Sequence, residues 1–257
     1  MGRDCRAAIP RRPPEGGQEW PPYNYNSSRA GNDSWQMLWR RENRVASGES
    51  TAILSRLVMP VKTRPITPEE YLRIEREAPF KSEYYGGEMF AMASGGRYHS
   101  LIKVNIAGTL RAFLKGHRCT AYDSNLRVSI PGEGLYTYPD LSIFCEPMTF
   151  MPGTDDTATN PTIIIEVLSK TTEAYDRGRK FESYRRLPSL REYLLVSQEA
   201  PVIERFTREG DDRWVLTTAR GLDAAMRIDV LDAELPLAEV YDKVDFRAAE
   251  PPPASPA

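Results

Sequence analysis

Apolar residues are concentrated in two short runs in the second half of the chain. Residues Thr162–Leu168 read TIIIEVL, and Glu192–Val196 read EYLLV. A nearly continuous apolar run of this length is typical of a strand that is buried on both faces of a sheet. The two runs therefore predict central strands, and the first of them places the carboxylate of Glu166 inside an otherwise apolar segment.

Three segments have the spacing or the flanking residues of helices. Residues 67–70 read TPEE, in which Thr67 is the expected N-cap and Pro68 the first helical residue. Residues 97–115 repeat apolar side chains at helical spacing, and Thr172–Arg186 forms a further predicted helix. Because these helices lie before and between the apolar runs, they are expected to cover the sheet that the runs form.

Shorter segments predict the other strands. Gly86-Gly87 is a typical hairpin turn, and residues 210–212 (GDD) resemble a second one. In chain order, the predicted strands are Ser82–Tyr85, Glu88–Ala93, Thr120–Ile130, Leu141–Cys145, Val202–Thr207 and Trp214–Thr218. Strands and helices in this order predict an α/β protein, a three-layer α/β/α sandwich with a mixed central sheet.

The two ends of the chain have a different composition. Residues 1–60 are rich in Pro, Gly and Ser, which predicts a disordered extension, with a short amphipathic helix at Ser34–Arg44. Met59 precedes the globular pattern, so residues 1–58 are interpreted as an extension or a misassigned start. The folded domain is expected to span residues 61–246, and residues 247–257 are expected to form a disordered tail.

Composition and charge exclude several classes of protein. The formal net charge is -2 and the pI about 5.9, so any surface for phosphates must be local. No apolar run approaches the ~20 residues of a membrane span. Two histidines, His99 and His117, are too few for a His-rich zinc site. Cys5, Cys119 and Cys145 show no paired spacing, which predicts reduced thiols and a cytoplasmic protein.

Two carboxylates are candidates for chemistry. Glu166 needs a compensating charge in its apolar strand, either a metal ion or a buried Lys or Arg. Asp140 begins another predicted strand, although a turn residue after Pro139 is an alternative explanation for it. If the two strands are neighbours, both carboxylates reach the same end of the sheet. Paired oxygen donors suit magnesium, which can activate water and neutralise charge on a phosphate.

Four sequence blocks occur in order between residues 64 and 245. They are Tyr138-Pro139-Asp140, residues 160–169 (NPTIIIEVLS), Asp176-Arg177 followed by Lys180 and Tyr184, and residues 191–196 (REYLLV). Together with Glu83 and His99, they resemble the Uma2 family of the PD-(D/E)XK nuclease superfamily. The resemblance implies a restriction-endonuclease-like, nuclease-like domain over residues 61–246. It also implies a metal-dependent endonuclease that hydrolyses phosphodiester bonds, with DNA as the expected substrate.

The resemblance implies a set of metal ligands. Asp140 and Glu166 would hold Mg²⁺ (or Mn²⁺), with help from the Val167 carbonyl. Glu83 would be a further acidic ligand, directly or through water. From the residues alone, a solvated strand residue is an equally good explanation for Glu83.

One position departs from the superfamily pattern. The motif Glu-x-Lys would place a lysine at position 168, where this chain has Leu168. The family instead implies Lys180, on the following helix, as the group that orients water or stabilises charge on the phosphate. Asp176, four residues earlier, also fits a surface ion pair with Lys180. Lys170 is interpreted as a solvated loop residue.

His99 and Arg177 are the expected phosphate contacts. Each has a simpler explanation: His99 as a structural residue at a helix N-terminus, and Arg177 as part of a solvated basic stretch. That stretch comprises Arg177, Arg179, Arg185, Arg186 and Arg191 around Lys180. In a nuclease it would contact the backbone without reading the sequence.

Two alternatives to an active enzyme stay open. Leu168 at the usual lysine position fits a catalytically inactive nuclease-fold protein that binds nucleic acid or a protein partner. The charged residues could also form only a structural ion-pair network at the sheet edge. If the protein cuts both strands of DNA, a homodimer is expected.

Overall fold

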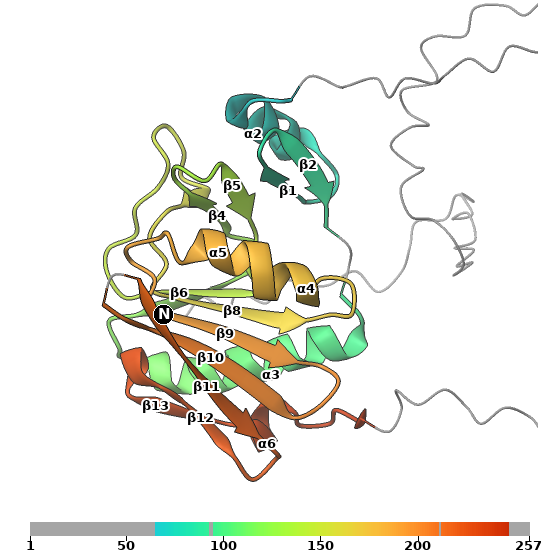
Figure 1. Cartoon of the computed structure of the whole chain (residues 1–257), viewed down its shortest axis with the longest axis vertical. Helices are drawn as coiled ribbons and strands as arrows, with labels where there is room; N and C mark the ends of the chain where they lie inside the picture. The colour runs from blue at the N-terminus through green and yellow to red at the C-terminus, as the bar shows by residue number, and fades with distance from the viewer. Residues whose placement is uncertain (1–64, 93–94, 211, 247–257) are drawn as a thin grey trace, which may run out of the picture. The chain divides into compact units, whose positions relative to one another are not determined.

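The computed structural model of this chain describes residues 65–92, 95–210 and 212–246 (Figure 1). The predicted extension at residues 1–60, the short helix at Ser34–Arg44 and the predicted tail lie outside the described residues. Within the described ranges, no helix is both long enough and apolar enough to cross a membrane.

A six-stranded mixed sheet contains both apolar runs. Its strands lie in the order β11-β10-β9-β8-β6-β3. They are β3 (Thr120–Asp123), β6 (Leu141–Phe144), β8 (Ile163–Leu168), β9 (Glu192–Ser197), β10 (Val202–Glu209) and β11 (Arg213–Arg220). β8 and β9 pair in parallel, and the other neighbours pair antiparallel. The runs TIIIEVL and EYLLV are therefore adjacent at the centre of the sheet.

Helices cover both faces of this sheet (Figure 1). α3 (Arg97–Leu114) packs on one face, where its apolar side chains form a core with Ile163 and Ile165 of β8. On the other face, Ile164 and Leu168 of β8 form a second core with Tyr184. The helical segment of that face consists of α4 (Glu173–Tyr175), η1 (Asp176–Lys180) and α5 (Phe181–Tyr184). The three-layer α/β/α sandwich is thus confirmed.

A smaller five-stranded sheet has the strand order β2-β1-β5-β4-β7. Its strands are β1 (Ser82–Tyr85), β2 (Glu88–Ala91), β4 (Arg127–Ile130), β5 (Leu135–Thr137) and β7 (Thr157–Ala158). The helix α2 (Pro68–Glu77) begins with the expected capping box at Thr67. Tyr71 of α2 packs against Tyr84 and Tyr136 of this sheet. The predicted first hairpin is therefore part of a second sheet.

The prediction of one strand at Thr120–Ile130 is wrong. The segment forms two strands, β3 in the large sheet and β4 in the small one. Asp123 causes the break, because its Oδ1 accepts a hydrogen bond from the backbone N–H of Asn125 at 2.9 Å, a side-chain turn typical of Asp. The chain passes from one sheet to the other at this turn.

The predicted helix at Thr172–Arg186 is interrupted by a π-helical turn, η1. Such turns insert into α-helices and are frequent at functional sites. Towards the C-terminus, the sequence pattern missed four short elements that complete the core on the α3 face. They are β12 (Ala225–Ile228), η2 (Asp229–Leu231), β13 (Ala233–Pro236) and α6 (Leu237–Val240).

Cys119 and Cys145 form a disulfide, so the prediction of reduced thiols is wrong for this pair. The two residues adjoin the paired ends of β3 and β6, where Thr120 lies opposite Phe144. This pairing brings together cysteines that are 26 positions apart. Disulfides are rare in the cytosol of most organisms, so the cysteines no longer support a cytoplasmic location.

Removing this disulfide is expected to lower the free energy of unfolding by about 3 kcal/mol, because the crosslink restricts the unfolded chain. Urea unfolding of Cys119→Ser/Cys145→Ser measures the loss, and mass spectrometry without reductant detects the bond. Cys5→Ser is the matched control and keeps the wild-type value. Equal stability of the wild type with and without reductant contradicts a stabilising disulfide.

Candidate active site

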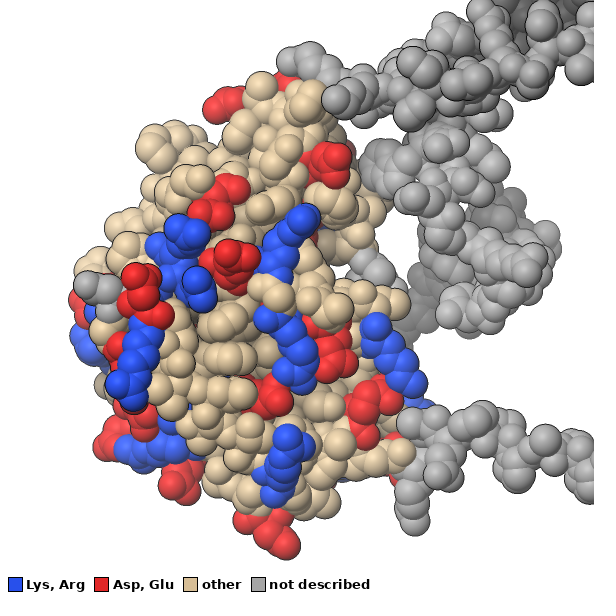
Figure 2. Space-filling view, in the orientation of Figure 1, with Lys and Arg blue, Asp and Glu red and all other residues tan. Residues whose placement is uncertain are grey.

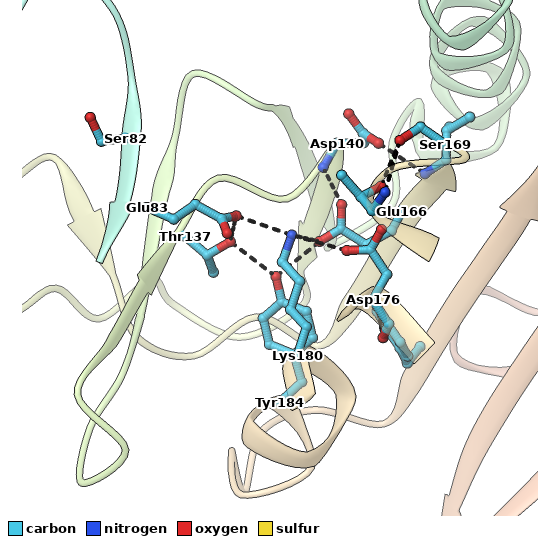
Figure 3. Close-up of polar contacts among 12 residues, drawn as sticks. Ser82, Glu83, Thr137, Asp140, Glu166, Ser169, Asp176, Lys180 and Tyr184 are labelled. Carbon is cyan, nitrogen blue, oxygen red and sulfur yellow. Dashed lines mark hydrogen bonds and ion pairs between the residues drawn. The ribbon is translucent and has the colours of Figure 1, made fainter. Parts of the chain in front are cut away.

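Asp140 and Glu166 lie side by side at one end of β6 and β8 (Figure 3). The strand register pairs Leu141 with Ile165, which places the two acidic residues opposite each other. The Asp140 backbone N–H donates to Glu166 Oε2 at 3.2 Å, and the Val167 N–H donates to Asp140 Oδ2 at 2.9 Å. The fold therefore brings the two carboxylates to one end of the sheet.

The Glu166 side chain is buried, with 4% exposed area. Its Oε1 accepts hydrogen bonds from Lys180 Nζ at 2.9 Å and from the Tyr184 hydroxyl at 3.0 Å. Burial raises the pKa of Glu166 to about 8; Lys180 opposes this rise, whereas the negative charges of Asp176 and Asp140 add to it. Lys180 and Tyr184 thus supply part of the compensation that a carboxylate in an apolar strand requires.

Lys180 is the centre of a buried ion-pair cluster (Figure 3). Its Nζ lies 2.9 Å from Glu166 Oε1, 3.1 Å from Glu83 Oε1 and 3.5 Å from Asp176 Oδ1. Burial alone would lower the pKa of this ammonium, but Glu166 and the other carboxylates raise it well above its usual value. Lys180 therefore stays charged at neutral pH, held among three carboxylates by the turn η1.

Leu168 lies two residues after Glu166 on the same strand, so both side chains point to the same face. It is 3% exposed and belongs to the core that contains Tyr184 and Leu187. The position that carries lysine in the superfamily pattern is therefore apolar packing in this chain. The ammonium group beside Glu166 comes from Lys180 on η1 instead.

The small sheet contributes Glu83 to the cluster. Glu83 lies on β1 and is 8% exposed. The Thr137 hydroxyl, at the end of β5, donates a short hydrogen bond to Glu83 Oε1 and lies 3.5 Å from the Tyr184 hydroxyl. Glu83 therefore joins Lys180 from a different sheet than Glu166.

Two basic side chains of α3 contact Asp140. His99 Nε2 lies 3.1 Å from Asp140 Oδ2, and Lys103 Nζ lies 3.3 Å from Oδ1. Burial would raise the pKa of Asp140, but His99, the Val167 N–H and Lys103 together hold it below its usual value. A Cβ atom on Gly95 would lie 2.4 Å from His99 Nδ1, so this glycine leaves room for the imidazole.

Arg177 points to other partners. Its Nε lies 2.7 Å from Glu173 Oε1, and its guanidinium also forms a short ion pair with Glu204. Basic and acidic side chains are interspersed over the face that carries α4, α5, β10 and β11 (Figure 2). The predicted basic stretch is thus partly neutralised. Lys170, with a side chain 73% exposed, pairs with Glu199, as expected of a loop residue.

Sequence patterns did not indicate Lys103 or Thr137 as site residues, and they indicated Tyr184 only as part of a family block. Lys103 follows His99 by four positions, so helical spacing could have placed it beside the same carboxylate. Tyr184 follows Lys180 by the same interval, and its hydroxyl contacts Glu166. Thr137 has no comparable local signal, because its role depends on the approach of β1 and β5.

The donor set suits a hard divalent cation, although its oxygen atoms are engaged by basic groups. Among the described residues, no three His, Cys, Asp or Glu side chains are arranged so that they could hold a metal ion together. Four carboxylates, however, share this site with Lys180, Lys103 and His99. They are Glu83, Asp140, Glu166 and Asp176. Carboxylate oxygens are the ligands that Mg²⁺ prefers, and a cation there would compete with Lys180 and Lys103.

Comparisons with known proteins identify a family for this chain. Residues 68–238 match the model of the family Uma2, described as "Putative restriction endonuclease". The match contains all of the site residues named above. The family supports a nuclease-like function, and such a function implies binding of nucleic acid.

Three individual proteins are similar to this chain. Two are uncharacterized proteins of Synechocystis sp. (strain ATCC 27184 / PCC 6803 / Kazusa). One is 36% identical over 62% of this chain and 82% of its own length, and the other is 30% identical over 68% and 99%. A crystal structure titled as a putative nuclease belonging to DUF820, from Anabaena variabilis ATCC 29413, has the same fold. It has a TM-score of 0.57 at 17% identity, over 69% of this chain and 98% of that chain. Because the family model matches residues 68–238, which is more than half of this chain, the chain belongs to the Uma2 family.

Proposed function

We propose that this protein is a metal-dependent endonuclease that hydrolyses phosphodiester bonds, with DNA as its substrate and Mg²⁺ (or Mn²⁺) as its cofactor. One observation carries the proposal: the Lys180 ammonium lies 2.9 Å from Glu166 Oε1, beside the Asp140 carboxylate. A lysine and two carboxylates at one sheet end are the groups that metal-assisted phosphoryl hydrolysis needs.

Asp140 and Glu166 would hold the cation, and Glu83 would be a further acidic ligand. When bound, such a cation supplies activation of water and neutralises charge on the phosphate. Lys180 would orient the attacking water or stabilise the developing negative charge. Its position between Glu83 and Glu166 supports this role.

His99 is the better candidate for a phosphate contact. It lies at the start of α3 beside Asp140, whereas Arg177 is held by Glu173 and Glu204. An imidazole N–H there can donate a hydrogen bond to a phosphate oxygen. A homodimer completes the proposal, because two copies would cut the two strands of DNA. The cytoplasmic location is a proposal from the sequence alone, which the Cys119–Cys145 disulfide does not support.

A specific observation favours a second candidate, a nuclease-fold protein that binds nucleic acid or a partner without cutting it. Lys180 is 5% exposed and is engaged by three carboxylates, and Leu168 is part of the core. In this candidate, the ammonium of Lys180 takes the place of the cation permanently. The ion pairs then hold the two sheets together and perform no chemistry.

A plasmid-nicking assay separates the candidates. The wild-type protein is expected to convert supercoiled plasmid to the nicked form in Mg²⁺ or Mn²⁺ and to be inactive in EDTA. Asp140→Ala is expected to lose the activity, whereas Glu146→Ala, at an exposed residue paired with Arg118, keeps it. Undiminished cleavage by Asp140→Ala overturns the site. Plasmid binding without cleavage in either metal supports the second candidate.

A further inference from the structure

The turn between β3 and β4 binds two lysine ammonium groups, one of which also contacts Asp140. Lys103 Nζ lies 2.9 Å from Ser124 Oγ and 3.3 Å from Asp140 Oδ1. Lys81 Nζ lies 2.7 Å from the Ser124 carbonyl and 2.6 Å from Asn125 Oδ1. One lysine comes from α3 and the other from the residue before β1, so two separate elements direct positive charge to a single turn.

These contacts extend the candidate active site in one direction. Lys180 contacts Glu166, whose neighbour Asp140 contacts Lys103, and Lys103 shares Ser124 with Lys81. The Lys103 side chain is 23% exposed, compared with 6% for Lys180. Lys81 and Ser124 are also partly exposed. The two lysines on this turn are therefore accessible to a large ligand, whereas Lys180 is enclosed.

The charge balance of the turn depends on Asp140. Asp140 is the carboxylate that balances Lys103. A divalent cation on Asp140 would neutralise that carboxylate and repel the ammonium. The Lys103 ammonium would then lack its carboxylate partner, and an anion could take that place.

We propose that Lys81 and Lys103 form a subsite for a backbone phosphate next to the phosphodiester that is cut. This inference rests on the proposed function and adds where the nucleic acid backbone lies. Ammonium groups contact phosphates without reading base sequence, so the subsite contributes affinity and position. It also supplies a local positive surface next to Asp140, whereas Arg177 is occupied by Glu173 and Glu204.

The test is the salt dependence of DNA binding. The full chain is titrated against a fluorescent DNA duplex in Ca²⁺, which also takes oxygen ligands, and gels establish that the duplex stays intact. For Lys81→Gln/Lys103→Gln, the slope of log affinity against log salt is expected to be less steep by about 0.9 for each phosphate that the variant no longer neutralises. In EDTA the difference in slope between this variant and the wild type is expected to shrink, because the Asp140 carboxylate again forms its ion pair with Lys103.

Two further variants control for charge and folding. Lys115→Gln removes the same charge at the exposed C-cap of α3 and is expected to keep the wild-type slope. Lys81→Arg/Lys103→Arg keeps both charges and is expected to restore it, and thermal denaturation checks that each variant is folded. A wild-type slope for the double Gln variant in Ca²⁺ overturns the subsite alone. A wild-type protein that binds neither duplex, single-stranded DNA nor RNA overturns the proposed function and the subsite together.

Discussion

Replacing Lys180 by methionine is expected to lower the free energy of unfolding by about 3–5 kcal/mol at neutral pH. Methionine fills a similar volume but leaves Glu83, Glu166 and Asp176 without the cation that all three contact. Removing one partner of a buried ion pair is costly because the remaining carboxylates must either stay buried without a counter-charge or take up protons. Urea unfolding in EDTA measures the change.

The same substitution is expected to reduce plasmid nicking by about 10²–10³-fold, the usual effect of losing a group that stabilises transition-state charge. Lys170→Met is the matched control: its side chain is 73% exposed and has one ion pair, so its expected effect on stability is below about 1 kcal/mol. Added Mg²⁺ is expected to restore part of the stability of Lys180→Met, because the cation replaces the lost charge. A Lys180→Met protein with wild-type stability and nicking contradicts both roles.

The sequence signal that identified Glu166 is real but is not specific to an active site. Glu192 also begins an apolar run and is fully buried. Its Oε1 lies 3.3 Å from Arg205 Nη1 and accepts a hydrogen bond from the Asp229 backbone N–H at 2.8 Å, which is an ordinary structural pair. Glu166 differs because further carboxylates surround it. That difference arises from tertiary contacts, so the apolar strand alone could not distinguish the two residues.

Four-residue spacing predicted that Asp176 pairs with Lys180 but placed the pair at the surface, whereas both side chains are buried. Asp176, Lys180 and Tyr184 recur every four residues, and the structure places all three at Glu166 or at its lysine. The π-helical turn that holds Lys180 has no sequence signature, because it depends on packing of the helix against β8 and β9. Hydrogen bonding of the Tyr193 hydroxyl to the Asp176 carbonyl, at 3.0 Å, is one such contact.

Long-range pairing accounts for what the sequence did not predict. The approach of Glu83 to Lys180 requires the small sheet, which could not be foreseen while Thr120–Ile130 was interpreted as one strand. Residues 123–125 (DSN) favour a turn and therefore indicate that break. The segments on both sides of them favour strands, so the turn was not predicted. Cys119 and Cys145 meet only because β3 pairs with β6. These features depend on strand order, which periodicity does not encode.

In EDTA, the stability of the wild-type protein is expected to fall as the pH rises from about 5 to about 9. Burial raises the pKa of folded Glu166 to about 8, above its value in the unfolded chain. A raised folded pKa contributes stability that is fully present below the unfolded pKa and is lost as the pH rises through the folded pKa. The pKa of Asp176 is also raised, chiefly by burial, and acts in the same direction. The expected loss is on the order of a few kcal/mol.

Two other groups of the site do not reverse this trend. The pKa of Asp140 is lowered, so its titration changes the stability only below this pH range. The pKa of Lys180 is raised, so its titration changes the stability only above this range. Glu166→Gln removes the largest contribution, so its stability is expected to change much less with pH, whereas Glu146→Gln keeps the wild-type profile. Because a metal ligand must be deprotonated, Mg²⁺ is expected to stabilise the wild type more at about pH 8 than at about pH 5, and Glu166→Gln at neither. A wild-type profile in EDTA that is flat, or that rises over this window, shows that Glu166 is already ionised at acidic pH and that Lys180 outweighs its burial.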